Sequence, residues 1–356
     1  MTFSIQGYPF DYTTNSKFSP IYKQQIKQRT LIIPGGGCVY YRANKGDVCP
    51  FCAFPPFSRY VIKGDNHDDY FESWALTADI YQKMYLAALQ DTQPFDKLAV
   101  FNGGSFFPSS ELPSQFQHFV YEDVAKKSNI KQLMVEAYPS FISEKKLQQA
   151  QEKLAATDLM IGIGFESLDG TVRNQYLKKR IDLALFETKV KMMQKLGVQV
   201  FIYAFLKAPQ LTERQALNET LATLEYLHQL GVDEIALSCA FVPPGTQLEA
   251  LFHAGEFRPP WLWSIIEIIE TAQKNGWPLS VGGFDDTPPP IATPSNCAKC
   301  DTKVLQAIDE HRLNNTTQGL AALDCECKRS WFSQVNTTKV QFENQADIDY
   351  QLISSN

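Results

Sequence analysis

Apolar runs of strand length alternate with longer segments of helical period from about residue 30 to residue 282. Parallel neighbouring strands need a crossover connection, which is usually a helix, so this alternation predicts βα units around a mostly parallel sheet. Six or seven such units favour a partial (β/α) barrel, with an open doubly wound sheet as the alternative. The apolar runs stand at residues 30–33, 98–101, 133–137, 159–165, 198–206, 234–238 and 279–282.

The segments between these runs are typical of amphipathic helices. Residues 73–90, 184–197 and 213–231 carry apolar side chains three and four positions apart, and the last two end in the glycine that is favoured just past a helix. After residue 287 the chain becomes rich in proline, then in cysteine, and ends in a polar tail. We therefore expect an N-terminal extension over 1–29, a barrel over 30–287 and a C-terminal four-cysteine extension over 288–356.

Composition narrows the class of protein. The chain has 356 residues, of which 44% are hydrophobic and 20% charged, so it can bury a large core and is neither disordered nor fibrous. Its net charge of −6 argues against binding nucleic acid through bulk positive charge, although a local basic patch stays possible. No run approaches the roughly 20 apolar residues of a membrane span, and the N-terminus lacks a signal-peptide pattern. We expect a cytoplasmic protein without a membrane partner.

The first cysteine group lies on a long stretch rich in glycine and proline that follows the first apolar run. Cys38, Cys49 and Cys52 have the spacing C-x10-C-x2-C. Three thiolates can hold three irons of a cubane iron–sulfur cluster and leave the fourth iron open to a ligand. Zinc with three cysteines and a fourth ligand is the alternative, but the nearest histidine, His67, is fifteen residues further on. Phe51, between the last two cysteines, would exclude water from a cluster.

A second cysteine group stands in the C-terminal extension, with the spacing C-x2-C-x24-C-x-C. Two close pairs of thiolates fit a tetrahedral structural zinc that fastens this segment to the rest of the chain. A second iron–sulfur cluster is the alternative. The group consists of Cys297, Cys300, Cys325 and Cys327, and the remaining cysteine, Cys239, is expected to be a small buried hydrophobe.

Four consecutive predicted strand ends carry groups that can bind a ligand. The thiolates follow the first strand, Gly103 and Gly104 follow the second, Glu136 ends the third and Glu166 ends the fourth. Active sites of βα barrels lie at these ends, where adjacent glycines let the backbone approach a ligand. The sequence therefore predicts one site built from these loops.

These motifs resemble the radical S-adenosylmethionine (radical SAM) enzymes of the elongator-like and methylthiotransferase-like branch. The resemblance is closest to the archaeosine-forming radical SAM family over about residues 30–331. It is carried by FNGGSFF, IGIGFESLDGTVRNQYLKK, VFIYAFLKAPQLTE, GEFRPPWLWS and NCAKCD with LDCECKRSW.

The resemblance implies a role for each matching position. The first cysteine group would ligate a [4Fe-4S] cluster whose free iron binds the amino and carboxylate groups of SAM. Gly103 and Gly104 would meet the SAM amino group. Glu136 and Glu166 would accept hydrogen bonds from the ribose hydroxyls. Lys179, with Lys178 as its neighbouring alternative, would face the SAM carboxylate.

The implied activity is cleavage of SAM to a 5′-deoxyadenosyl radical that abstracts hydrogen from an amine-bearing substrate. The substrate would be an amine-bearing small molecule or modified tRNA, for example a lysine-modified 7-deazaguanine whose C–N bond is cleaved in a lyase or oxidoreductase reaction. A reducing electron-transfer protein would be the partner. The alternatives are a methylthiotransferase with two clusters and a non-catalytic, zinc-stabilised binding protein.

Four further residues are candidates for substrate contact. Lys207 directly follows the fifth apolar run, while Arg258, Trp261 and Trp263 stand together in GEFRPPWLWS. An arginine and aromatic rings can stack on a base. The tryptophans can equally begin a helix and bury their rings, and this structural role is the interpretation that we favour for them.

Overall fold

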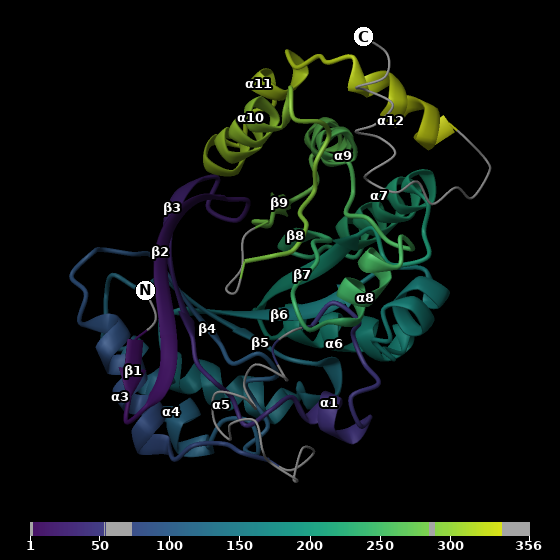
Figure 1. The fold of residues 1–356 in the computed structure, drawn as a ribbon. Helices are drawn as coiled ribbons and strands as arrows, with labels where there is room; N and C mark the ends of the chain where they lie inside the picture. The colour runs from purple at the N-terminus through teal and green to yellow at the C-terminus, as the bar shows by residue number, and fades with distance from the viewer. Residues whose placement is uncertain (1–2, 53, 55–72, 285–288, 337–356) are drawn as a thin grey trace. The chain divides into compact units, whose positions relative to one another are not determined.

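The computed structural model describes residues 3–52, 54, 73–284 and 289–336 (Figure 1). His67 lies outside these ranges. Internal contacts divide the chain into two compact units. Unit 1 comprises Met1–Val48, Phe54–Gly164 and Ile181–Ile202, and unit 2 comprises Cys49–Ala53, Phe165–Arg180 and Tyr203–Asn356.

Unit 1 is built on strands β1 to β6 and the first half of β7. The three N-terminal strands are antiparallel: β1 (Phe3–Ile5), β2 (Tyr8–Ser19) and β3 (Gln24–Ile32). From β3 onward the pairing is parallel, through β4 (Lys97–Phe101), β5 (Gln132–Glu136) and β6 (Asp158–Glu166). The register aligns the strand ends that carry the predicted site, as the pairs Ile32 with Phe101, Val100 with Val135 and Glu136 with Gly162.

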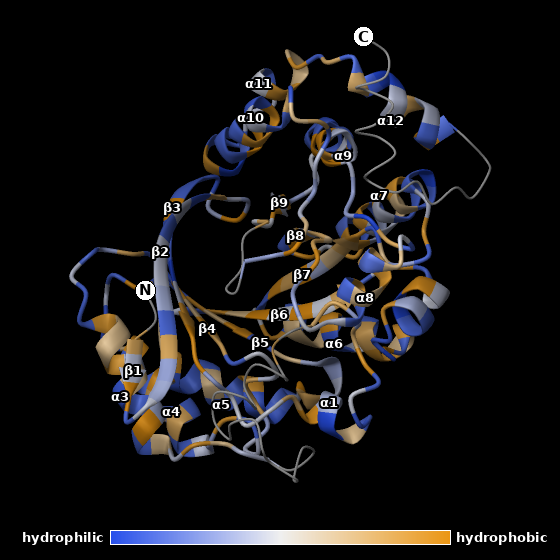
Figure 2. Cartoon of the chain, viewed as in Figure 1, coloured by the Kyte–Doolittle hydropathy of each residue, from blue (hydrophilic) through white to orange (hydrophobic). Residues whose placement is uncertain are grey.

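Helices join these parallel strands and pack on one another. The chain of neighbours runs from α3 (Ala78–Leu89) to α4 (Ser114–Val124), α5 (Glu144–Leu154) and α6 (Leu183–Lys195), with α1 (Val39–Ala43) and η1 (Pro139–Phe141) as short turns. Strands buried on both faces should be hydrophobic throughout, and Figure 2 shows this colour along β4 and β5. Ser143 and Asp182 cap α5 and α6 by accepting backbone N–H groups.

Unit 2 contains the second half of β7 (Gln199–Leu206), β8 (Glu234–Cys239) and β9 (Leu279–Val281). Strands β8 and β9 are parallel, and the strand order follows the chain from β1 to β9. Helix α7 starts with a capping box between Thr212 and Gln215. The helical elements are η2 (Val172–Tyr176), α7 (Glu213–Gln229), α8 (Gln247–His253), α9 (Leu262–Asn275), α10 (Asp301–Asn314), α11 (Gln318–Ala321) and α12 (Cys327–Asn336).

The predicted α/β fold, a partial (β/α) barrel with a C-terminal four-cysteine extension, is confirmed. The last six predicted strands coincide with β4 to β9 to within one residue at either end. The first differs: it was expected at residues 30–33 and spans Gln24–Ile32, because β2 pairs along its whole length. The antiparallel strands β1 and β2 were not predicted. Within the described residues no helix is both long and apolar enough to cross a membrane.

Candidate functional site

In unit 1, the loop after β3 lies against the loop after β4. Cys38 is the N-cap of α1, and its Sγ accepts the Tyr41 N–H at 3.5 Å. Just before it, the Gly36 N–H donates to the Glu111 carbonyl at 2.9 Å. A Cβ on Gly36 would lie 2.3 Å from the Ser110 carbonyl oxygen, so only glycine permits this approach.

The glycine pair is part of the same contact. A Cβ on Gly104 would lie 1.9 Å from the Glu111 Oε2 and 3.3 Å from the Cys38 Cα. Two of the predicted site elements, the first cysteine and the glycine pair, are therefore neighbours within unit 1.

Glu111 is a buried carboxylate that sequence reasoning missed. It accepts backbone N–H groups from Val39 at 2.7 Å and Ser105 at 2.5 Å, and the Asn102 side-chain amide at 3.3 Å. Its side chain is inaccessible to solvent, and burial raises its pKa to about 7 against the opposing effect of these donors. It is not part of a periodic apolar pattern, so nothing in the sequence distinguished it from a surface acid.

Glu136, at the end of β5, is half-buried beside the same loops. Its carbonyl accepts the Phe106 N–H at 2.8 Å. Two residues later the Tyr138 N–H donates to the Ser105 Oγ at 3.0 Å, and the Tyr138 ring stacks on Tyr40 at 5.0 Å between centroids. The end of β5 is thereby joined to the loop that carries Cys38.

In unit 2, a buried ion pair lies beside the other two cysteines of the first group. The Lys179 Nζ is 3.0 Å from the Glu166 Oε1, and the two side chains are 13% and 6% exposed. The same ammonium is 5.9 Å from the centre of the Phe51 ring, while the Cys52 N–H donates to the Cys49 carbonyl at 3.1 Å. Lys178 instead contacts Gln247 at 3.5 Å, so Lys179 is the lysine that the structure places on Glu166.

The charges of this cluster influence one another strongly. Burial raises the pKa of the Cys49 thiol, and the Lys179 ammonium lowers it in part. Burial lowers the pKa of Lys179, but the Cys49 thiolate and the Glu166 carboxylate outweigh that effect, so the pKa is raised overall. Burial also raises the pKa of Glu166, with Lys179 opposing it. Lys179 is thus a fixed cation beside a thiol and a carboxylate.

Comparison with known proteins identifies relatives of the chain. No family model matches the chain. It is 26% identical over 309 residues to archaeosine synthase subunit beta of Methanosarcina acetivorans, which covers 86% of this chain and 84% of that protein. Archaeosine synthase subunit beta of Thermococcus kodakarensis is 24% identical over 310 residues, with 85% and 89% covered.

The chain is a homologue of these archaeosine synthase beta subunits. Among solved structures, the queuine lyase from Clostridium spiroforme bound to SAM and queuine superimposes with a TM-score of 0.48 and 19% identity, covering 76% of this chain and 94% of that chain. The two archaeosine synthase beta subunits confirm the resemblance that the sequence motifs indicate.

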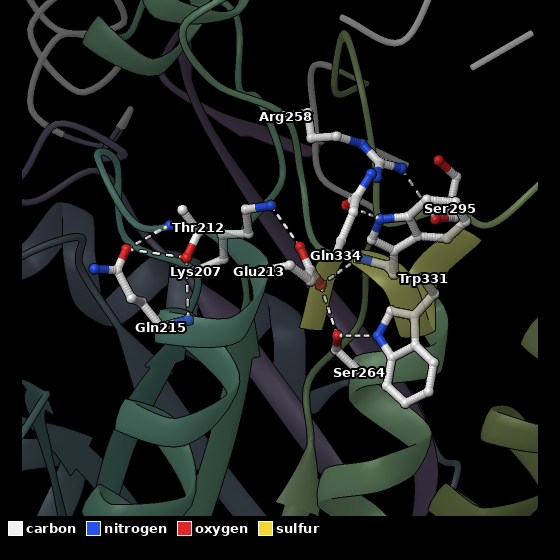
Figure 3. A network of polar contacts seen from close by, with 10 residues as sticks. Lys207, Thr212, Glu213, Gln215, Arg258, Ser264, Ser295, Trp331 and Gln334 are labelled. Carbon is white, nitrogen blue, oxygen red and sulfur yellow. Dashed lines mark hydrogen bonds and ion pairs between the residues drawn. The ribbon is translucent and has the colours of Figure 1, made fainter. Parts of the chain in front are cut away.

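This chain also contains a second buried ion pair, at the end of β7 in unit 2 (Figure 3). The Lys207 Nζ contacts the Glu213 Oε2 at 2.5 Å. The other oxygen, Oε1, accepts the Trp261 N–H at 2.9 Å and the Ser264 hydroxyl at 2.6 Å. The Trp331 indole N–H of α12 donates to the Ser264 Oγ at 2.8 Å. Glu213 was not recognised in the sequence because an acid in the first turn of a helix is ordinary.

The predicted substrate contacts Arg258, Trp261 and Trp263 are all buried. The Arg258 guanidinium lies 4.5 Å from the Trp261 ring centre. The indole N–H of Trp261 donates to Gln334 at 2.8 Å, and that of Trp263 donates to the Cys327 Sγ at 3.3 Å. These engaged N–H groups and buried rings favour packing over stacking on a substrate for both tryptophans.

The second cysteine group converges to one point within unit 2. Its sulfur atoms all lie within 4.8 Å of one another. The measured Sγ–Sγ distances are 3.6 Å for Cys297–Cys300, 3.8 Å for Cys297–Cys325 and 3.6 Å for Cys300–Cys327. Four sulfur atoms this close fit a metal site.

Proposed function

We propose that the chain is a radical SAM enzyme in which Cys38, Cys49 and Cys52 bind a [4Fe-4S] cluster. The observation that carries this proposal is that each part of the cysteine loop packs on strand-end groups able to bind SAM. Cys38 lies beside Gly104 in unit 1, and Cys49 lies in the field of Lys179 in unit 2. When bound, the cluster supplies the electron that cleaves SAM and yields a 5′-deoxyadenosyl radical.

The residues of this chain would bind, orient and shield the cofactor. Glu166 has room for donors besides Lys179, which suits a ribose hydroxyl, and Glu136, at the end of the neighbouring strand, would bind the other hydroxyl. The Lys179 ammonium would pair with the SAM carboxylate. Phe51, which stacks on Phe205 at 4.5 Å, would keep water away from the cysteines on either side of it.

For the substrate we propose an amine-bearing compound, either modified tRNA or a smaller metabolite. The name of the homologues and the sequence motifs support C–N bond cleavage of a lysine-modified 7-deazaguanine, which is a lyase-type reaction. Because the homologues are named as subunits, this chain would act with a second subunit, and a reducing electron-transfer protein would deliver the electron. Lys207 and Arg258 are buried, so a substrate would have to displace their present partners before it could contact them.

For the second cysteine group we propose a structural zinc ion. A tetrahedron of thiolates around Zn²⁺, with Zn–S of about 2.3 Å, has sulfur–sulfur edges of about 3.8 Å. Three of the six sulfur–sulfur distances are 3.6–3.8 Å, and all six lie within 4.8 Å, close to these edges. In a [4Fe-4S] cluster each cysteine binds a different iron, so the four sulfur atoms of the cysteines lie farther apart than around one ion. The geometry therefore favours a single ion over a second cluster.

The test of the activity is anaerobic reconstitution, reduction and mass analysis for 5′-deoxyadenosine. The wild type should be brown and produce it, whereas Cys38→Ala, Cys49→Ala and Cys52→Ala should not. Cys239→Ala is the matched control, because Cys239 is buried outside both groups. Full deoxyadenosine production by Cys49→Ala would sink the assignment, and a colourless protein holding only zinc would make it a non-catalytic binding protein.

Metal analysis tests the second site. We expect one zinc and four irons per chain. Cys300→Ser should lose zinc and solubility before it loses iron, since binding at such sites contributes folding free energy on the order of 10 kcal/mol. A stable variant that lost half of its iron would establish two clusters and favour methylthiolation.

Substrate is tested by incubating the reduced enzyme separately with tRNA carrying the lysine adduct and with the free modified base. Turnover of the tRNA alone would assign the RNA, and turnover of the free base alone would assign the metabolite. If neither reacts while deoxyadenosine still forms, the archaeosine-type reaction is wrong for this chain.

A further inference from the structure

The Glu111 side chain joins the two loops of unit 1 that carry Cys38 and the glycine pair. It follows the glycine pair by a few residues and precedes α4, outside every motif that carries the resemblance. The side chain is inaccessible to solvent. A buried carboxylate is costly unless it is well bonded, so its partners explain why it is there.

Each oxygen of the carboxylate holds a different loop. The Glu111 Oε1 accepts the N–H of Val39, the residue directly after Cys38, at 2.7 Å. The Oε2 accepts the N–H of Ser105, the residue directly after the glycine pair, at 2.5 Å. The Glu111 carbonyl also accepts the Gly36 N–H at 2.9 Å, so one residue holds the cysteine loop on both sides of Cys38.

The second glycine of the pair is shaped to this carboxylate. A Cβ on Gly104 would lie 1.9 Å from the Glu111 Oε2, which no side chain can tolerate without displacing it. The same Cβ would lie 3.3 Å from the Cys38 Cα. Gly104 is therefore required for the approach of Glu111 and not only for the approach of a ligand.

We infer that Glu111 is a positioning residue that fixes the Cys38 thiolate relative to the backbone of Gly103 and Gly104. The inference rests on the proposed function, in which Cys38 binds the cluster and the glycine pair meets SAM. The cysteine loop that holds the cluster and the glycine loop that holds the SAM amino group must then stay at a fixed distance from each other. A single rigid carboxylate that bonds both loops sets this separation, as outer partners of metal ligands commonly do.

The chemistry requires glutamate at this position. Both carboxylate oxygens accept backbone N–H groups, and a glutamine can accept on only one side while its NH₂ meets the other N–H. An aspartate is one methylene shorter and cannot reach both loops. Glu111→Gln is therefore the decisive variant, and Glu122→Gln, on the exposed face of α4, is the matched control.

The experiment compares iron content, the electron paramagnetic resonance spectrum of the reduced cluster with and without SAM, and the kinetics of deoxyadenosine formation. We expect Glu111→Gln to retain its iron but to lose the spectral change on adding SAM. Its KM for SAM should rise roughly 10- to 100-fold, more than its kcat falls, as for other outer partners of metal sites. A purely structural role would lower the melting temperature and leave these quantities unchanged in the folded protein.

A second variant keeps the inference testable if Glu111→Gln fails to fold. Gly104→Ala should raise the KM for SAM in the same way, and Glu111→Ala combined with Gly104→Ala should lose less than the sum of the two single losses, because the clash is relieved. Additive losses, or a wild-type spectrum and KM in Glu111→Gln, would overturn the inference alone. A wild-type chain that never cleaves SAM would instead overturn the proposed function.

Discussion

Two buried lysine–glutamate pairs lie within unit 2, one at the end of β6 and one at the end of β7, and their surroundings differ. Glu166 ends β6 and pairs with Lys179, while Lys207 follows β7 and pairs with Glu213. Both strand-end residues have left-handed backbone angles, with φ of 70° and 71°. Such angles cost about 1–3 kcal/mol for a residue other than glycine, so surrounding contacts must impose them.

The two carboxylates differ in how many donors they hold. Glu213 accepts from Lys207, the Trp261 N–H and the Ser264 hydroxyl, so both its oxygens are engaged. Within the described ranges, the carboxylate of Glu166 accepts only from Lys179. We call a carboxylate saturated when both its oxygens accept hydrogen bonds within the protein, and such a group stabilises the fold. A buried carboxylate that still has acceptor positions is unsaturated and can bind a ligand hydroxyl.

The surrounding charges differ as well. Burial lowers the pKa of Lys207, and the Arg258 guanidinium lowers it further against the effect of Glu213. For Lys179 the neighbouring thiolate and carboxylate outweigh burial and raise the pKa. The neighbouring anions thus outweigh burial at Lys179, whereas burial and Arg258 together outweigh Glu213 at Lys207. Lys179 is therefore the better suited of the two lysines to hold an anionic group as a cation.

The largest loss of stability is expected when the saturated pair, Lys207 with Glu213, is broken. Glu213→Ala leaves Lys207 as an uncompensated buried charge and removes the acceptor of the Trp261 N–H, so it should cost about 3–5 kcal/mol of unfolding free energy. Urea denaturation measures this loss. Glu225→Ala, at an exposed position of the same helix, should change the free energy by less than about 0.5 kcal/mol. Equal losses in the two variants would show that the Glu213 network contributes nothing to stability.

Breaking the unsaturated pair, Lys179 with Glu166, should instead weaken the binding of SAM. Lys179→Met removes a charged donor from the proposed SAM carboxylate and should weaken SAM binding by about 10- to 100-fold, equivalent to roughly 1.5–3 kcal/mol. Equilibrium binding of SAM to the reconstituted protein measures it. Lys178→Met is the control, since that side chain contacts Gln247. If both variants bind SAM like the wild type, Lys179 has only a structural role.

Whether the sequence can predict a residue of these pairs depends on how far apart its partners lie along the chain. Strand ends could be read from local apolar runs, so Glu166 and Lys207 were recognised as candidates. Glu213 and Glu111 could not be, because their partners lie in other loops: Glu111 bonds a residue 72 positions away, and Glu213 bonds one 48 positions away. The N-terminal strands were missed for a similar reason, since their polar alternation acquires meaning only through pairing with β3.

A smaller effect is expected at the far end of the saturated network. Trp331→Phe removes the indole N–H that donates to Ser264, which should cost about 1 kcal/mol for the hydrogen bond plus a contribution from the lost ring volume. Phe332→Leu is the control, because that neighbouring ring is 61% exposed. Thermal unfolding measures the difference, and SAM cleavage should be unchanged in both. A loss of SAM cleavage in Trp331→Phe would mean that the two pairs are coupled.

The smallest effect is the acid dependence of stability that Glu213 contributes. Burial raises its pKa, but Lys207 and Arg258 lower it by more, so the folded pKa lies below the ordinary 4.5. A carboxyl with a depressed pKa contributes stability that is present above its unfolded pKa and lost as the pH falls through the folded pKa. The stability advantage of the wild type over Glu213→Gln should therefore be full at neutral pH and shrink below pH 4.5. Urea unfolding of both proteins across this range measures it, and a constant difference would mean that Glu213 stabilises the fold by hydrogen bonding alone.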